Sequence, residues 1–146
     1  MNKNAFAFPM VQLLRNNFVE SLHLGSAVVV GPENNILVEW GKTDEAIFPR
    51  SSIKLIQAIP LVESGAASRY KLGLKEIALA CSSHQGTPLH TKLIKKWLIE
   101  IGFVESDLKC GTQPPSDGLE RQKLKNLGEE PSTLHNNCSG KHAGFL

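Results

Sequence analysis

The sequence lacks the features that mark several specialised protein classes. Its 146 residues contain three cysteines, carry a net charge of +2, and include no apolar run near the roughly 20 residues that a membrane-spanning helix needs. Three thiols cannot all pair with one another, so a disulfide-stapled fold is not indicated and a reducing compartment is expected. The scattered basic residues and small net charge exclude a polyanion partner such as nucleic acid.

The first residues also lack a secretion signal. One early lysine and some apolar residues are present, but Asn4, Pro9 and Gln12 interrupt the apolar stretch, and no small-residue cleavage site follows before Arg15. We therefore expect a cytoplasmic protein with no membrane association.

What is present suits a globular domain. Hydrophobic residues make up 41% of the chain, enough for a core, and the length fits a single domain over residues 1–146. Periodicity and turn residues predict an early β-hairpin followed by helices, which is an α+β arrangement. The expected strands are 26–30 and 36–40, the expected helices are 51–65 (bent or ended near Pro60), 74–81, 91–101 and 119–127, and residues 110–118 are expected to form a loop.

The segment FPRSSIK places Ser51 at an expected helix start and Lys54 three residues later. Residues three apart share a helix face, so the amine can lie beside the hydroxyl and act as its base. The same spacing recurs at Ser68/Lys71 and Ser106/Lys109, in polar segments, so spacing alone leaves open a plain helix cap and a solvated lysine. The apolar residues that follow Ser51 distinguish the first copy.

Two further polar clusters interrupt the apolar pattern. In ACSSHQG, Ser83 could relay a proton or bind a polar substrate group and His84 could contact substrate or act as acid or base, while local capping and turn formation is the alternative. In HNNCSGKH, Cys138 and His142 lie four apart and could bind a metal, or Cys138 could be a nucleophile. A buried thiol beside a glycine-containing turn explains the second cluster equally well.

Taken together and in order, FPRSSIK, ACSSHQG and HNNCSGKHAGF resemble the rhizobial-type L-asparaginase family, which is distinct from the threonine-dependent bacterial asparaginases. The resemblance runs from about residue 26 to the last residue. It implies a fold similar to serine β-lactamases and glutaminases, in which an antiparallel sheet carries a helical domain. It also implies hydrolysis of the side-chain amide of L-asparagine.

The resemblance assigns roles to individual residues. Ser51 falls on the family's nucleophile, Lys54 on its lysine partner and Ser83 on a further catalytic serine, while Cys138 and Lys141 fall on two zinc ligands. The family's other zinc-ligand cysteine and a second catalytic lysine lie beyond the last residue of this sequence. We therefore expect an incomplete zinc site and the amino-terminal portion of a catalytic domain, which could be inactive alone.

Arg50 and His84 are the expected substrate contacts, with Arg50 beside the nucleophile able to hold the substrate carboxylate. A homodimer is compatible with the resemblance. Two other functions stay open: a penicillin-interacting serine hydrolase or glutaminase of the same superfamily, and a non-catalytic fragment.

Overall fold

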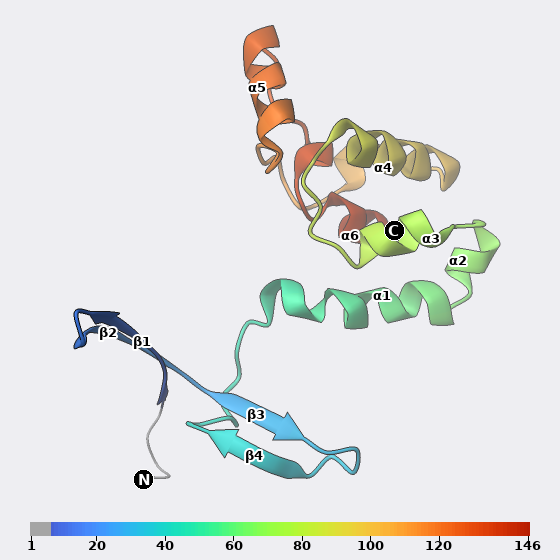
Figure 1. The fold of residues 1–146 in the computed structure, drawn as a ribbon. Helices are drawn as coiled ribbons and strands as arrows, with labels where there is room; N and C mark the ends of the chain where they lie inside the picture. Colours follow the sequence, from blue (N-terminus) through green and yellow to red (C-terminus); the bar gives the residue numbers. More distant parts are fainter. Residues whose placement is uncertain (1–6) are drawn as a thin grey trace. The chain divides into compact units, whose positions relative to one another are not determined.

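The computed structural model describes residues 7–146. By the density of their contacts, the residues divide into two compact units, Met1–Phe48 and Pro49–Leu146, and each is described by itself below. The first contains strands and the second contains helices (Figure 1). That the two units together form one domain stays a prediction.

The first unit contains two separate antiparallel hairpins. Strand β1 (Phe8–Arg15) pairs with β2 (Phe18–Gly25), and the pairing of Arg15 with Phe18 leaves a two-residue turn of Asn16 and Asn17. Both asparagines have positive φ angles, 46° and 68°, which is the backbone of the tight turn that best matches the twist of paired strands. This turn sets the register of the first hairpin.

The second hairpin pairs β3 (Ala27–Val30) with β4 (Ile36–Trp40). Its connection contains Asn34, whose φ of 58° again lies in the left-handed region that asparagine tolerates. The described strands form two two-stranded sheets rather than one continuous sheet.

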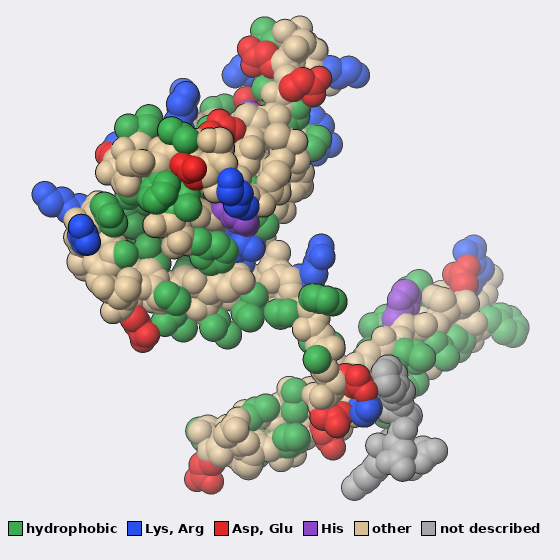
Figure 2. Space-filling view, turned by 180° about the vertical axis from the view of Figure 1, so that it is seen from behind, with side chains coloured by type: hydrophobic (Ala, Val, Ile, Leu, Met, Phe, Trp, Pro, Cys, Tyr) green, Lys and Arg blue, Asp and Glu red, His purple; other side chains and the backbone are tan. Residues whose placement is uncertain are grey.

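Both hairpins have little interior of their own. Between residues 7 and 48, Gly31 alone is buried, and large apolar side chains such as Phe18 (79% exposed) lie on the surface. Figure 2 shows hydrophobic side chains along the surface of these strands. Two-stranded hairpins with so little burial depend on further packing for their stability.

The second unit is helical and begins with a 3-10 turn. Its 3-10 turns are η1 (Arg50–Ile53), η2 (Glu105–Asp107) and η3 (Thr133–His135), and its α-helices are α1 (Lys54–Glu63), α2 (Ala66–Arg69), α3 (Leu74–Ala80), α4 (Pro88–Glu100), α5 (Gly118–Leu127) and α6 (Ser139–Ala143).

The core of this unit lies where α3, α4 and α6 meet (Figure 1). Ile94, Trp97 and Leu98 of α4 are almost fully buried and pack against the apolar residues of α3. Helix α6 approaches α3 closely at Gly140, where an added Cβ would lie 2.8 Å from the Leu79 carbonyl oxygen. A glycine is therefore required for this contact, which brings the residues around Cys138 next to the end of α3.

The α+β class and the hairpin between residues 26 and 40 are confirmed. The first hairpin was not predicted, although the Asn16–Asn17 pair between apolar runs is a signal for it. The largest differences lie at the ends of two helices: α1 begins after the η1 turn and continues through Pro60 to Glu63, and α4 begins at Pro88 rather than at residue 91. Helix α5 ends at Gly128, with φ 66°, as expected.

Candidate active site

The serine expected to start a helix lies instead in the η1 turn. Ser51 is exposed, and its neighbour Ser52 donates a hydrogen bond from Oγ to the carbonyl oxygen of Pro49, which closes the turn. Arg50, directly before Ser51, has a φ of 53°, an uncommon backbone region for a residue with a long side chain. Such strain concentrates at functional positions, where the surrounding structure holds the backbone in place.

Lys54, at the first position of α1, is only 3% exposed. Its Nζ donates to the carbonyl oxygen of Ser82 at 2.8 Å and to the Oγ of Ser83. The Ser83 hydroxyl in turn donates to Ser51 Oγ at 3.1 Å. The structure thus joins Lys54, Ser83 and Ser51 in one chain of hydrogen bonds, with Ser83 between the amine and Ser51.

The end of α3 delivers Ser82 and Ser83 to this position. The backbone N–H of Ser82 still donates to Leu79, one turn back, and the chain then leaves the helix. The Ser82 carbonyl is therefore free to accept from Lys54, and the Ser83 side chain points to Ser51. Two segments almost thirty residues apart supply the three groups.

His84, the residue after Ser83, is buried, with 5% exposure. Its Nδ1 accepts from the backbone N–H of Gly86 at 3.1 Å, and its Nε2 lies 2.8 Å from Ser139 Oγ. Burial, followed by the charges of His90, Lys54 and His135, lowers the pKa of His84 to about 4. His84 is therefore neutral at physiological pH.

A pocket of about 520 Å³ opens beside Ser51. Its lining combines residues of η1 and α1 with the loop after η2 and the segment that leads into α6: Arg50, Ser51, Lys54, Cys110, Gln113, Asn136, Asn137, Cys138, Lys141 and His142. Three of these side chains are lysine or arginine and none is a carboxylate, so the pocket suits a substrate that carries an anionic group.

The Asn136 side chain links two segments that line this pocket through hydrogen bonds. Its side chain is 7% exposed, and Nδ2 donates to the carbonyl oxygens of Cys110 (2.9 Å) and Gly111 (3.1 Å). Its Oδ1 accepts from the backbone N–H of Cys138 at 2.8 Å. The amide therefore holds the Cys110 loop against the start of α6.

The residues expected to bind zinc line the same pocket. Cys138 and Lys141 are half-buried, and Cys110 and His142 lie beside them. Burial raises the pKa of the Cys110 thiol, and burial together with Lys141 lowers the pKa of His142. Within residues 7–146, no group of three or more His, Cys, Asp or Glu side chains is arranged to hold a metal ion. Two donors do not fill a tetrahedral zinc site, so these residues alone do not fit a closed one.

Comparison with known proteins identifies the family. Residues 11–146, nearly the whole chain, match the family model described as L-asparaginase II. The chain belongs to this family. No curated protein sequence matches it significantly. Membership of the L-asparaginase II family agrees with the resemblance of the three motifs and indicates an amidohydrolase that acts on a small molecule. No helix among the described residues is long and apolar enough to cross a membrane.

The structure brings most of the predicted site residues together. Ser51, Lys54 and Ser83 share one hydrogen-bonded chain, and Cys138 and Lys141 line the pocket beside Ser51. Arg50 also lines the pocket, whereas His84 lies outside its lining. The roles of Asn136 and Ser139 were not predicted from the sequence. Both lie among other polar residues of the same motif, and only their hydrogen-bond partners distinguish them.

Proposed function

We propose that the complete protein is an L-asparaginase that hydrolyses the side-chain amide of L-asparagine through an acyl-enzyme on Ser51. The single observation that supports it best is the hydrogen-bonded chain from Lys54 through Ser83 to Ser51. A serine hydroxyl becomes an effective nucleophile when a base can remove its proton, and this chain offers a path for that proton. Family membership supplies the substrate class.

The first step forms the acyl-enzyme. The hydroxyls first turn so that Ser51 donates to Ser83 and Ser83 donates to an unprotonated Lys54 amine, the reverse of the directions in the structure. Ser51 Oγ then attacks the side-chain amide carbon of asparagine while its proton passes to Ser83 and the Ser83 proton passes to Lys54 Nζ. The C–N bond then breaks, and the departing nitrogen takes a proton back along the same chain and leaves as ammonia. Water hydrolyses the resulting ester to release aspartate and the free Ser51 hydroxyl.

Arg50 is the proposed contact for the substrate carboxylate. It lines the pocket next to Ser51, and a guanidinium can bind a carboxylate through two parallel hydrogen bonds. The absence of a carboxylate from the lining within the described residues means that the α-ammonium group of asparagine needs an acceptor of another kind, such as a carbonyl or amide oxygen. Gln113 and Asn137 are polar residues of this lining.

Zinc would be held by Cys138 and Lys141, together with donors from elsewhere. A bound zinc would supply a positive charge that organises the pocket. No step of the reaction above passes through it, because the described residues supply two donors of the four required. A cytoplasmic location and a homodimeric assembly also stay predictions.

The test measures ammonia release by the full-length protein from asparagine and from glutamine, and in a separate incubation it measures covalent labelling of the protein by a penicillin. The proposal predicts ammonia from asparagine with a kcat/KM well above that for glutamine, and no lasting acylation by the penicillin. Stable labelling of Ser51 by the penicillin, without turnover of asparagine, would support the penicillin-interacting alternative instead. If the protein neither hydrolyses an amide substrate nor reacts with the penicillin, a non-catalytic role is the remaining alternative.

A further inference from the structure

The hydrogen bonds around His84 define its tautomer. Nδ1 accepts a hydrogen bond from the Gly86 backbone N–H, so in the neutral ring the proton must lie on Nε2. Nε2–H then donates to Ser139 Oγ at 2.8 Å, and the Ser139 hydroxyl donates to the carbonyl oxygen of Leu134 at 2.9 Å. Each donor and acceptor in this row of hydrogen bonds, from Gly86 through His84 and Ser139 to Leu134, has a partner, so the direction of every hydrogen bond in the row is defined.

This row connects two parts of the candidate active site. His84 directly follows Ser83, and Ser139, which is fully buried at 0% exposure, directly follows Cys138. A second link runs in parallel, because the backbone N–H of His84 donates to the carbonyl oxygen of Asn137 at 3.2 Å. The loop that carries Ser83 is therefore attached at two points to the segment that carries Cys138.

The same geometry leaves His84 without a free group for substrate. Its side chain is 5% exposed, both ring nitrogens are engaged within the protein, and it does not line the pocket beside Ser51. The ring also stacks on His90 with the centroids 5.0 Å apart, which occupies one of its faces. A direct contact with asparagine would require this arrangement to break.

We propose that His84 is a positioning residue, which acts through Ser139 to hold the Ser83 loop where Ser83 can relay the proton between Ser51 and Lys54. The proposal rests on the proposed function, and it replaces the expectation that His84 contacts the substrate. It predicts that loss of the His84–Ser139 contact lowers the rate of chemistry and leaves substrate binding nearly unchanged.

The test compares Ser139→Ala, His84→Asn and His84→Gln in the full-length protein. Asn can place an acceptor near the position of Nδ1, and Gln can place a donor near that of Nε2, so His84→Gln retains the Ser139 contact that His84→Asn loses. Ser132→Ala is the matched control, since Ser132 hydrogen-bonds to Leu134 and His135 within its own turn and, among the described residues, makes no hydrogen bond to the loop that carries Ser83.

For Ser139→Ala and His84→Asn we expect kcat to fall by at least about tenfold with KM changed by less than about threefold, a partial rescue by His84→Gln, and little effect of Ser132→Ala. A plot of kcat/KM against pH should have an acidic limb and an alkaline limb in every active variant, as in the wild type. A raised KM with unchanged kcat would mean that His84 contacts substrate, and the loss of one limb would mean that it is an acid or base. Either result would overturn the proposal, as would a kcat of Ser139→Ala equal to that of the control.

A nuclear magnetic resonance measurement separates this proposal from the proposed function. The wild-type His84 ring should be the Nε2–H tautomer, and Ser139→Ala should shift the backbone amide signals of Ser82 and Ser83 while Ser132→Ala leaves them in place. These signals do not depend on the reaction catalysed. If asparagine is not hydrolysed but the shifts are seen, the function fails and the positioning link stands; if the signals do not move, the link is wrong.

Discussion

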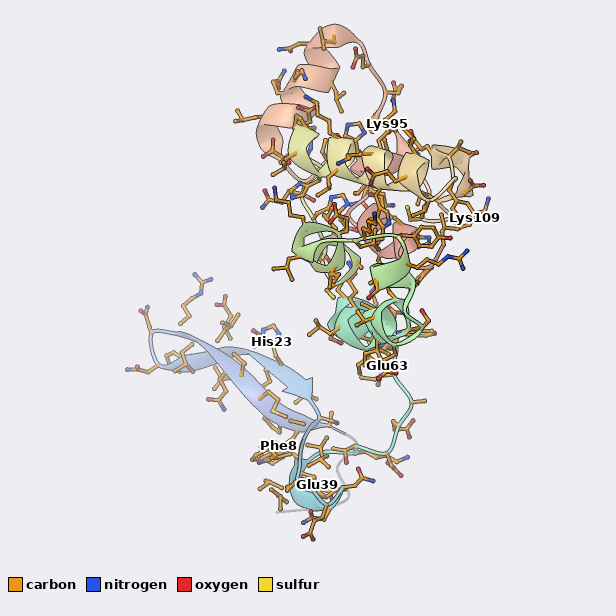
Figure 3. All side chains as sticks on the ribbon, turned by 90° about the vertical axis from the view of Figure 1, so that its right-hand side faces the viewer. Phe8, His23, Glu39, Glu63, Lys95 and Lys109 are labelled. Atoms are coloured by element: carbon orange, nitrogen blue, oxygen red, sulfur yellow. The ribbon has the colours of Figure 1, made fainter. Side chains whose placement is uncertain are left out.

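Of the three Ser-x-x-Lys segments in this chain, a first, Ser51/Lys54, and a second, Ser106/Lys109, have the same spacing and different surroundings. In the first, the Lys54 amine is buried and donates to Ser82 and Ser83, which lie in another segment. In the second, the Lys109 amine is exposed and turns back to the carbonyl oxygen of its own partner, Ser106, at 3.0 Å. Lys109 lies at the outer surface of the helical unit (Figure 3).

The difference shows what the spacing lacks. Both segments have the same separation of three residues, but in neither does the lysine amine hydrogen-bond to the serine hydroxyl of its own motif. In the first segment a second hydroxyl, that of Ser83 after the end of α3, lies between the two groups. The Ser51 hydroxyl accepts its hydrogen bond from Ser83, not from Lys54. The catalytic potential of the motif therefore depends on tertiary structure, and matched changes in the two segments can test it.

The largest expected effect is that of removing the Ser51 hydroxyl, compared with removal of the Ser106 hydroxyl. Ser51→Ala should lower kcat for asparagine in the full-length protein by at least about a thousandfold, because it removes the nucleophile. Ser106→Ala, the same change in the other segment, should leave kcat within about twofold of wild type. The assay is ammonia release, with circular dichroism to verify folding. A Ser51→Ala protein that retains most of its activity would refute the nucleophile assignment.

A second comparison removes the two amines. Lys54→Met keeps most of the buried side-chain volume and deletes the proton acceptor, so kcat should fall by about 10²–10⁴. Lys109→Met should have little effect, since its amine contacts only a nearby carbonyl on the surface. Equal losses in the two variants would show that the tertiary setting of Lys54 does not matter for catalysis.

His84 makes the stability of the protein depend on pH. Its pKa of about 4 lies below the 6.5 expected in the unfolded chain, so the unfolded protein binds more protons between these values. The stabilisation from neutral His84 is complete above about pH 6.5 and is lost as the pH falls towards 4, about 2–3 kcal/mol after allowance for solvent screening.

Urea unfolding of the full-length protein at several pH values would measure this slope. The charges of His90, Lys54 and His135 also lower the pKa of His84, so they contribute to the effect. His84→Gln should be less stable than wild type at neutral pH and should lose part of the slope between pH 6.5 and 4. An unchanged slope in this variant would assign the acid sensitivity to other groups.

The smallest expected effect concerns Arg50. Arg50→Gly removes the guanidinium and relieves a backbone with φ of 53°, so the protein should be no less stable while KM for asparagine rises by about tenfold. Arg50→Lys should restore part of the affinity through its charge alone. Steady-state kinetics and thermal unfolding measure both quantities, and an unchanged KM in Arg50→Gly would exclude Arg50 as the carboxylate contact.

Local patterns in the sequence predicted much of the fold. The β3–β4 hairpin, helices α1, α3, α4 and α5, and the stop at Gly128 follow from turn residues and apolar periodicity, which act over a few positions. The β1–β2 hairpin was not predicted, although Asn16 and Asn17 provide a turn signal between its two strands. The early start of α4 follows from Pro88, which suits the first position of a helix.

The residues of the candidate site could be proposed from the sequence, but the hydrogen bonds that connect them could not. Family motifs identified Ser51, Lys54 and Ser83, and the structure adds that Ser83 lies between the other two. The role of Asn136 could not be read from the sequence, because its partners Cys110 and Gly111 lie about 25 residues away and only folding brings them together. Long-range contacts of this kind leave no periodic pattern.

The most direct test of the central claim is the position of a covalent label. A diazoketone analogue of asparagine alkylates the nucleophile of an amidohydrolase, and peptide mass spectrometry of the full-length protein then locates the modified residue. Our account predicts modification of Ser51, prevented by excess asparagine and absent from Ser106. Asparagine-protected modification of Cys138, Ser83 or any other residue in place of Ser51 would contradict it.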